Sequence, residues 1–419
     1  ARLVRRYGAA VRLETAHDCP EGLVSFLRRQ FSFEPDDVYL VNGPVNLNRL
    51  MSLYDLVDRP DLKFPAYKPG IPARMAPQAD LFTVIRQGDV LLHHPYQSFQ
   101  PVSDFVRRAA TDPRVLAIKM TLYRAGADSM IVESLVEAAR NGKDVTVIVE
   151  LRARFDEAAN IELANRLQEA GVHVMYGVVG FKTHAKLILV VRREHRGLRR
   201  YCHIGTGNYH ARTARTYTDY GLFTADQQVG EDLHDLFRQL TSLTRAPRLR
   251  RLLQSPFTLH AGLVERIERE ARHARAGRPA RILAKMNSLI EPQVVQALYR
   301  ASQAGVRCEL IVRGICALRP GVPGVSDNVT VRSIVGRFLE HTRVYYFENG
   351  GEGELWCASA DWMERNFFRR VEVAFPVERR KLRERILDDL DAYLEDNVNA
   401  WQLNADASYS RLTPGDAPP

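Results

Sequence analysis

Apolar residues along the chain follow the short period of strands and the three- and four-residue spacing of helices. The clearest example is 114–155, RVLAIKMTLYRAGADSMIVESLVEAARNGKDVTVIVELRARF, which predicts a strand, a helix and a second strand. Residues 281–318, RILAKMNSLIEPQVVQALYRASQAGVRCELIVRGICAL, repeat this order. Such units supply parallel strands covered on both faces. The pattern therefore predicts an α/β fold of two tandem domains related by an internal repeat.

The segments outside the repeat suggest domain boundaries. An alternating stretch at Val11–Glu14 and a helical stretch at Gly22–Gln30 predict a partial α+β segment at the start. Five prolines between Pro60 and Pro77 favour an extended connector. We expect residues 1–70 to be the end of a preceding domain with its linker, 71–252 and 253–412 to be the two α/β domains, and 413–419 to be a disordered tail.

Two amphipathic helices are predicted outside the repeated units. One carries Leu233, Leu236, Phe237 and Leu240 just before the second boundary. The other runs from Glu378 to Leu394 and has one apolar stripe, formed by Leu382, Ile386, Leu390 and Leu394. This stripe is explained by core packing, and an interface is the alternative.

Each repeat continues into a predicted strand that carries a histidine. The segments are FKTHAKLILVV at 181–191, with His184, and FLEHTRVYYF at 338–347, with His341. Ligand sites in α/β folds lie at strand ends and domain junctions. A duplicated unit with one histidine per copy therefore suggests that both imidazoles meet at the interface between the copies.

The first histidine has neighbours that suit an anion. On a continuous strand, His184 and Lys186 would leave the same face. The segment HIGTGNY, at 203–209, predicts a turn in which small residues let backbone N–H groups approach a phosphate and Asn208 can orient a histidine or an oxygen. Either motif alone is more often an ordinary strand or turn, but their occurrence in this order favours a phosphate site.

Composition and charge narrow the class of protein. There are 59 basic and 50 acidic residues, a formal charge of +9, which suits a polyanionic partner. No apolar run is long enough for a membrane span, so we expect a cytoplasmic location, while peripheral membrane association stays open. The five scattered cysteines favour neither a disulfide framework nor a zinc site. No nucleic-acid-binding module is recognisable, and no nucleic-acid partner is expected.

The order His-x-Lys followed by Gly-Thr-Gly-Asn resembles the phospholipase D superfamily, in which two His-Lys-Asp motifs build one phosphoryl-transfer site. Two positions depart from its pattern. The aspartate expected five residues after the lysine falls at Val191, and the second copy has Arg343 where that superfamily has lysine. Both departures weaken a phosphodiesterase reading.

A more extensive resemblance is to the polyphosphate kinase family, which makes inorganic polyphosphate from ATP. Eight blocks resemble that family in its order: QGDVLLHHPYQSF (87–99), MTLYRAGADS (120–129), ELRARFDEAANI (150–161), GFKTHAKL (180–187), HIGTGNYH (203–210), LIVRGICALRPG (310–321), EHTRVYYFENGG (340–351) and SADWMERN (359–366). The resemblance implies two phospholipase D-like catalytic domains. It also implies an N-terminally incomplete chain, in keeping with a start at Ala1.

The resemblance implies roles for individual residues. His184 matches the family's phosphohistidine nucleophile, and His341 matches its second active-site histidine. Arg124 and Arg154 match residues at a magnesium-phosphate site, Arg313 an ATP-contacting arginine, and Tyr217 an aromatic that stacks on adenine. Lys186 and Asn208 are added here as phosphate-binding residues. The resemblance gives no role that we can derive for His93, His94, Lys119, Lys285 and Asn287.

The expected function is reversible transfer of the ATP γ-phosphate to an inorganic polyphosphate chain, with Mg²⁺ as cofactor and ATP, ADP and polyphosphate as partners. No P-loop or protein-kinase motif is present, so ATP would be held in another way. A homo-oligomer is expected. Two alternatives stay open: a phospholipase D-like phosphodiesterase or nuclease, and a non-catalytic basic fragment that binds polyanions.

Overall fold

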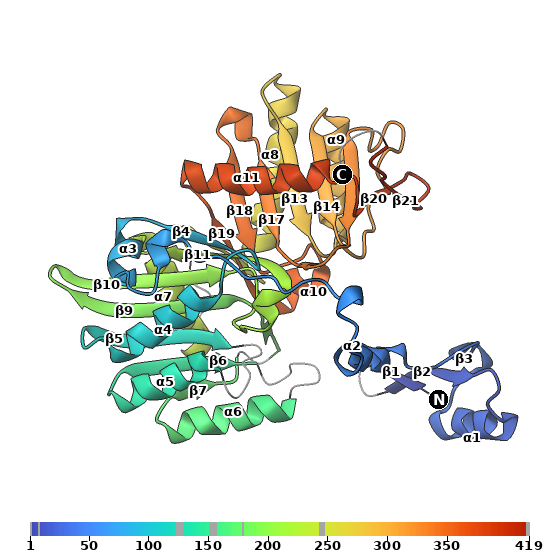
Figure 1. Ribbon diagram of the computed structural model, residues 1–419. Coiled ribbons are helices and arrows are strands. Elements are labelled where there is room, and N and C mark those ends of the chain that lie inside the picture. The colour runs from blue at the N-terminus through green and yellow to red at the C-terminus, as the bar shows by residue number, and fades with distance from the viewer. Residues whose placement is uncertain are drawn as a thin grey trace. The chain divides into compact units, whose positions relative to one another are not determined.

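The computed structural model describes residues 2–6, 9–122, 129–150, 157–177, 180–242 and 248–415. The chain divides into two compact units, Ala1–Tyr67 and Lys68–Pro419 (Figure 1). Among the described helices, none has the length and apolar character needed to cross a membrane.

The first unit is a small α+β segment. Its three-stranded sheet has the order β1-β2-β3, with β1 (Arg2–Arg6) antiparallel to β2 (Ala9–Ala16) and β3 (Val38–Val41) parallel to β2. Helix α1 (Glu21–Phe31) confirms the predicted helical stretch, and α2 (Leu53–Leu56) is a single turn.

The second unit contains two α/β sheets, one for each repeat. In the first repeat, β5 (Val115–Leu122), α5 (Met130–Arg140) and β6 (Asp144–Val149) form a parallel βαβ unit. In the second repeat, β13 (Arg281–Met286), α9 (Pro292–Gln303) and β14 (Arg307–Val312) do the same. The predicted internal repeat and the α/β class are therefore confirmed.

The first sheet has the order β16-β11-β10-β9-β5-β6-β7, and β4 also pairs with β11. Its further elements are α3 (Leu81–Gln87), β4 (Val90–His94), α4 (Gln100–Thr111), α6 (Glu157–Glu169), β7 (His173–Met175), β9 (Lys186–Glu194), β10 (Gly197–Gly205), β11 (Tyr217–Thr224) and α7 (Gln227–Ser242). Helix α7 confirms the first amphipathic prediction.

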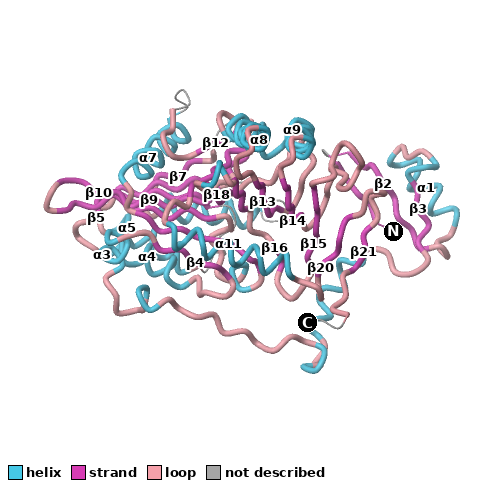
Figure 2. The backbone as a smooth tube through the Cα atoms, turned by 90° about the horizontal axis from the view of Figure 1, so that it is seen from above, coloured by secondary structure: helices cyan, strands magenta, loops and turns pink. Residues whose placement is uncertain are grey.

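The second sheet has the order β12-β19-β18-β17-β13-β14-β15-β20-β21, and β8 also pairs with β19. Its further elements are β12 (Leu253–Ser255), α8 (Leu259–Arg275), β15 (Val329–Ile334), β17 (Val344–Phe347), β18 (Glu354–Ala358), α10 (Glu364–Phe368), β19 (Arg370–Pro376), α11 (Arg380–Glu395), β20 (Ala400–Leu403) and β21 (Tyr409–Arg411). Helices α8 and α9 lie on one side of this strand layer and α11 on the other (Figure 2).

Two short strands cross between the repeats. Strand β8 (Lys182–Thr183) comes from the first repeat but pairs with β19 of the second. Strand β16 (Leu339–Glu340) comes from the second repeat but pairs with β11 of the first. The continuous strands predicted at 181–191 and 338–347 are therefore wrong. Each is broken at its histidine, because the preceding two residues bond to the other repeat's sheet.

The buried core is also shared between the repeats. One apolar cluster combines Leu187 and Leu236 of the first repeat with Val373 and Leu390 of the second. Ile386 and Leu390 of α11 are buried in it, and Leu382 and Leu394 pack against it. The apolar stripe on this helix is therefore core packing rather than an exposed interface.

Leu390→Ala should lower the free energy of unfolding by about 2–5 kcal/mol, because a nearly fully buried side chain is removed from this shared cluster. Leu198→Ala is the matched control, since Leu198 is 59% exposed on β10 and its loss should change the value by about 0.5 kcal/mol or less. Urea unfolding of both variants measures the difference. Equal values for the two would contradict the burial of α11.

Candidate active site

The crossing of β8 into the second repeat places His184 beside a buried carboxylate. Lys182 and Thr183 pair with Arg370 and Val371, and the backbone N–H of His184 donates to the Val371 carbonyl oxygen at 2.9 Å. The His184 Nδ1 atom then lies 2.9 Å from both carboxylate oxygens of Glu372. A carboxylate can only accept, so Nδ1 carries the hydrogen and Nε2 carries the lone pair.

Glu372 is held in place by neighbours of its own repeat. Its side chain has no exposed surface, and it accepts hydrogen bonds from Asn366 Nδ2 at 2.6 Å and from the Ser359 hydroxyl. Arg370 Nη1 lies 3.8 Å from the same carboxylate. The carboxylate therefore has a fixed position, which fixes the ring plane of His184.

His184 is held neutral by its surroundings. Burial is the main cause that keeps its pKa well below the ordinary value, and the nearby charges of Lys186, Arg370 and Arg343 add to it. A neutral imidazole with its lone pair on Nε2 is a nucleophile at neutral pH.

His341 occupies the corresponding place in the other crossing. Strand β16 pairs with β11 so that Leu339 and Glu340 face Tyr217 and Thr218. The His341 Nδ1 atom lies 2.9 Å from both carboxylate oxygens of Asp219, the next residue of β11. Each histidine is thus oriented by an acidic residue of the other repeat, and the two sites follow the same register. Both histidines meet in one region, since each repeat's residues influence the pKa of the other's histidine.

The Gly-Thr-Gly-Asn turn holds the second carboxylate. Thr206 Oγ1 donates to Asp219 Oδ1 at 2.6 Å and accepts from the Tyr220 backbone N–H at 3.1 Å. A Cβ atom on Gly207 would lie 2.0 Å from Asp219 Oδ2, so only glycine allows this approach. These glycines therefore make room for a carboxylate, a role different from the predicted backbone contact with phosphate.

Arg343, which replaces the expected lysine, bridges an acid and the second histidine. Its Nε and Nη2 atoms lie 3.2 and 3.0 Å from the two oxygens of Asp361. Its Nη1 lies 3.3 and 3.1 Å from the two ring nitrogens of His341. Near-equal distances place this nitrogen over the ring face. Asp361 in turn accepts from the Asn287 backbone at 2.7 Å.

Lys186 is buried beside His184, but the two residues do not share one face of a continuous strand as predicted. The strand is interrupted before it, and its Nζ donates back to the His184 carbonyl oxygen. Burial lowers the pKa of Lys186 to about 7, partly offset by the negative charge of Glu372. The ammonium therefore gains or loses its charge near neutral pH.

Several other predicted residues gather around the second histidine. The Tyr217 ring lies 5.2 Å from the His341 ring. Arg313 Nε donates to Asn287 Oδ1 at 3.0 Å and to the Glu340 carbonyl oxygen at 2.6 Å. Lys285, which had no assigned role, forms a buried ion pair with Glu340 at 2.8 Å. These contacts connect residues 285–287 to the backbone that carries His341.

Other predicted residues that the structure describes lie apart from the two histidines. Lys119 is half-buried on β5, paired with Thr146 and Leu189, and is not the buried counterpart of Lys285. His93 lies 3.1 Å from Asp389 on α11, whereas His94 and Asn208 lie behind Asp219. Arg124 and Arg154 fall outside the described residues.

Sequence reasoning missed the three acidic residues that orient the site, Asp219, Asp361 and Glu372. The available signal was an acidic residue inside an otherwise apolar or aromatic strand, as in YTDYG and VEVAF. Such a residue in a buried strand needs a charged or hydrogen-bonded partner. For Asp219 and Glu372 the partner could not be identified, because it lies more than 120 residues away along the chain. Asp361 lies outside the strands and pairs with Arg343, 18 residues before it.

The described residues do not fit a resident magnesium ion. Mg²⁺ prefers carboxylate, phosphate and water oxygens in an octahedral arrangement. Among the residues that the structure describes, no group of three or more His, Cys, Asp or Glu side chains is placed to hold a metal ion. The carboxylates of Asp219, Asp361 and Glu372 are already engaged by histidine or arginine.

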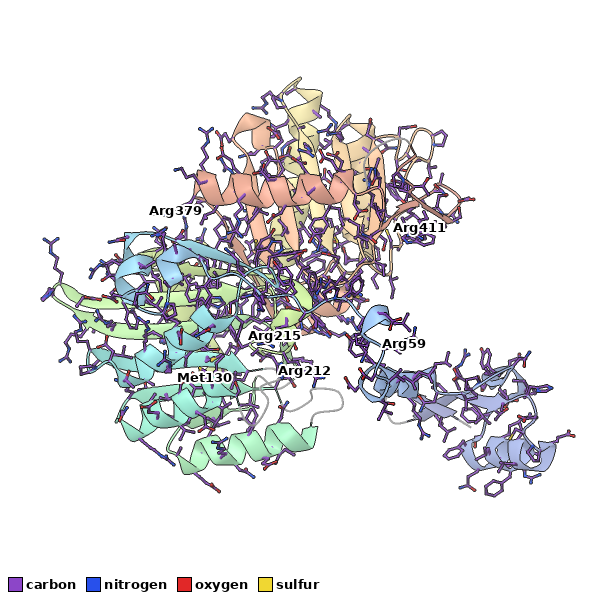
Figure 3. The ribbon with its side chains drawn as sticks, viewed as in Figure 1. Arg59, Met130, Arg212, Arg215, Arg379 and Arg411 are labelled. Atoms are coloured by element: carbon purple, nitrogen blue, oxygen red, sulfur yellow. The ribbon has the colours of Figure 1, made fainter. Side chains whose placement is uncertain are left out.

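A cavity of about 510 Å³ opens beside the turn that follows Asn208. Arg212, Arg215 and Met130 lie near one another at this place (Figure 3). The N-terminal residues of α4 and α5, Gln100 and Met130, also line it. Two arginines and two helix N-termini make the cavity favourable for an anion.

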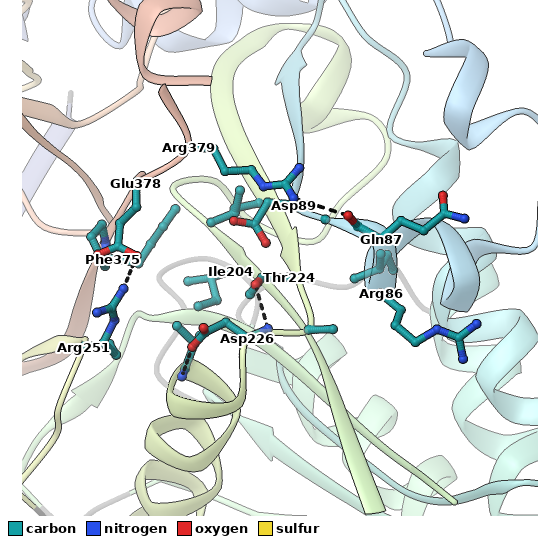
Figure 4. Close-up of a pocket in the computed structure, with 16 residues that line it drawn as sticks. Arg86, Gln87, Asp89, Ile204, Thr224, Asp226, Arg251, Phe375, Glu378 and Arg379 are labelled. Carbon is teal, nitrogen blue, oxygen red and sulfur yellow. Dashed lines mark hydrogen bonds and ion pairs between the residues drawn. The ribbon is translucent and has the colours of Figure 1, made fainter. Parts of the chain in front are cut away.

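A second pocket lies among Arg86, Asp89, Arg251, Glu378 and Arg379 (Figure 4). Its charges are already matched within the protein. Arg251 pairs with Glu378, and Arg379 donates to the Gln87 carbonyl oxygen at 3.3 Å. This pocket is therefore a weaker anion site than the 510 Å³ cavity.

Comparison with known proteins fixes the family. Residues 3–53, 80–246 and 252–418 match the family models of the polyphosphate kinase middle domain, C-terminal domain 1 and C-terminal domain 2. The chain belongs to the polyphosphate kinase family. The polyphosphate kinases of Pseudomonas aeruginosa and Xylella fastidiosa are 58% and 60% identical to it over 98% of this chain, and the match covers 59% of each relative. The chain thus spans about three fifths of these relatives.

Solved structures support the same assignment. The polyphosphate kinase of Porphyromonas gingivalis matches with a TM-score of 0.88 at 33% identity, covering all of this chain and 64% of the other. A phosphatidylserine synthase of Haemophilus influenzae matches with a TM-score of 0.51 at 10% identity, over 77% of this chain and 88% of the other. The second likeness shows a shared fold alone.

Gly207→Ala should destabilise this polyphosphate kinase family member by about 1–3 kcal/mol, because the new methyl group displaces the Asp219 carboxylate. Gly336→Ala is the control, since its Cβ would meet its nearest neighbour, Asn399, at 3.8 Å. Thermal or urea unfolding of both variants measures the effect. Equal stability of the two would contradict the close approach of Gly207 to Asp219.

Proposed function

We propose that the chain carries the catalytic centre of a polyphosphate kinase, with His184 as the phosphoryl carrier. The observation that supports this most directly is the neutral His184, whose Nδ1 is fixed on Glu372 so that Nε2 carries the lone pair. In the first step, Nε2 forms a bond to the γ-phosphorus of ATP, and the bond from that phosphorus to the β–γ bridging oxygen breaks to release ADP.

In the second step, a terminal oxygen of polyphosphate bonds to the phosphorus and the N–P bond breaks, which lengthens the chain by one phosphate. The same two steps in reverse make ATP. Lys186 and Arg343 lie beside the reacting histidines and stabilise the charge on the transferred phosphoryl group. His341 stabilises the leaving phosphate, and because its pKa is lowered it supplies a proton there only after its Nε2 has taken one up.

The substrates are assigned to the surroundings of this centre. Tyr217 and Arg313 hold ATP, and Arg124 and Arg154 belong to the magnesium-phosphate site that the family resemblance implies. Asn208 lies behind Asp219 and is not assigned to phosphate. Magnesium enters as the MgATP substrate complex, bound through phosphate oxygens. The cavity beside Arg212 and Arg215 holds part of the polyphosphate chain.

The remaining predictions belong to the same proposal. The domain limits at 70, 252 and 412, a cytoplasmic location and a homo-oligomer are proposed on the sequence and the family. Phosphodiester hydrolysis is disfavoured, because Arg343 replaces the second lysine of the phospholipase D pattern.

His184→Ala should abolish covalent phosphorylation by MgATP, and Glu372→Gln should slow it by about 10²–10⁴-fold, because the amide NH2 can donate to Nδ1 and stabilise the wrong tautomer. Intact-protein mass measured at alkaline pH, where phosphohistidine survives, detects one added phosphoryl group. His195→Ala is the control, since His195 is exposed on a turn. Phosphorylation of the His184→Ala variant at the rate of the native chain would overturn the nucleophile assignment.

The Arg212→Ala/Arg215→Ala variant should bind linear polyphosphate more weakly and with a smaller salt dependence, since two cations are removed from the cavity. Arg199→Ala removes an exposed arginine from β10 and serves as the control. Titrations at two salt concentrations measure both quantities. A loss of polyphosphate affinity no larger than that of the control would show that the polymer does not bind in this cavity. That result would not bear on the role of His184.

Tripolyphosphate binding should weaken by about tenfold as pH rises through 7, because the Lys186 ammonium loses its charge above its pKa of about 7. Lys186→Met keeps the length of the side chain without its charge and should flatten this dependence. Comparing the two proteins at each pH cancels the titration of the ligand itself. The same pH dependence in both would show that Lys186 is not the titrating group.

A further inference from the structure

Three buried hydrogen-bond acceptors lie together behind Asp219. His94 and His203 are 5% and 2% exposed, and Asn208 stands in the turn beside them. Among the described residues, no group bonds to His94 Nε2, His203 Nε2 or Asn208 Oδ1, although each of these atoms is buried. A buried polar atom without a partner is costly, so this cluster calls for a hydrogen-bond donor.

The bond on the other side of the ring fixes the tautomer of His94, and a hydroxyl partner allows the same tautomer in His203. His94 Nδ1 lies 2.8 Å from the Gln97 carbonyl oxygen, which only accepts, so Nδ1 donates. His203 Nδ1 lies 2.9 Å from the Tyr209 hydroxyl, and the same hydroxyl lies 3.2 Å from the His203 carbonyl oxygen, to which it can donate its one hydrogen. With the hydroxyl hydrogen on that carbonyl, His203 Nδ1 donates and its Nε2 accepts, as in His94. Burial, the main cause, lowers the pKa of His203 to about 3, and it also lowers the pKa of His94.

A small cavity is bordered by these groups and by Asp219. It has a volume of about 10 Å³ and is lined by His94, His203, Asn208, Gly207 and Asp219. This is about the space that one water molecule requires. Phe99 and Ala214 line both this cavity and the 510 Å³ cavity beside it.

We propose that the His94, His203 and Asn208 side chains bind one buried water molecule behind the Asp219–His341 pair. The water donates its two hydrogens to the two Nε2 atoms. Its oxygen accepts from the Asn208 side-chain NH2 group, which requires a 180° rotation of the amide that exchanges its oxygen and nitrogen. Three hydrogen bonds are typical of a buried water. A metal ion fits less well, because the Asp219 oxygens are engaged by His341 and Thr206.

The water links three parts of the first repeat at the point where they support Asp219. His94 ends β4, His203 lies on β10, and Asn208 belongs to the turn in which Gly207 touches Asp219. The bound water thus makes His94 and His203 positioning residues, which act on His341 only through this turn and Asp219. It also gives His94 a role that the sequence did not provide.

Diffraction at atomic resolution, with neutrons to locate hydrogen, tests the site directly on the full chain. The expected result is one water within 3.2 Å of both Nε2 atoms, with the hydrogen of each ring on Nδ1. A metal ion in its place, a hydrogen on either Nε2, or the lack of an ordered water would overturn the proposal. None of these outcomes depends on turnover, so they are independent of the proposed phosphoryl transfer.

A second measurement uses the ¹⁵N resonances of the histidine rings. His94→Phe keeps a ring of similar size but removes one acceptor, and should shift the Nε2 resonance of His203 because the shared water loses an anchor. His195→Phe, on an exposed turn, is the matched control and should leave that resonance in place. An unchanged His203 resonance in a folded His94→Phe variant would contradict a shared water.

Discussion

The reciprocal pairing of β8 with β19 and of β16 with β11 is the constraint on which the rest of this structure depends. Each repeat sends a two-residue strand into the other repeat's sheet, and the residue that follows each strand is a histidine. The register of each strand pair then decides which side chain lies beside the histidine. It is Glu372 beside His184 and Asp219 beside His341. A shift of one residue in either short strand would move its histidine out of register with the carboxylate. The shared core under α7 and α11 holds both pairings in place.

Burial of so many ionisable groups is tolerated because their charges are matched. Lys186, Lys285 and Arg343 are almost fully buried, and so are Asp219, Glu340, Asp361 and Glu372. An unpaired buried charge costs several kcal/mol of folding free energy. Removing one residue of a buried ion pair therefore destabilises the protein, because the charge of the other residue is left unpaired. Both histidines stay neutral in this setting, because burial and the surrounding cations disfavour a further positive charge.

The fold followed from local pattern, whereas the contacts of the site did not. Alternation and helical spacing were sufficient to predict the two βαβ units and α7, because these signals lie within a few tens of residues. The break of each strand at its histidine depends on pairing with a distant strand, which no local pattern encodes. The roles of Glu372 and Asp219 were not predicted, because they too depend on pairing with a distant strand. The family resemblance pointed to His184 and His341, but only the register explains why Nδ1 of His184 is held by Glu372 and Nε2 is left with the lone pair.

The most direct test of this account is the position of the phosphoryl group on the phosphorylated chain. Nδ1 of His184 is held by Glu372, so the account predicts a single phosphohistidine at residue 184 with phosphorus bonded to Nε2. Peptide mapping identifies the residue, and phosphorus–proton correlation spectra distinguish the two ring nitrogens. Phosphorus on Nδ1 of His184, or on His341, would contradict the central claim that the exchanged strands and their carboxylates assign the two histidines their different roles.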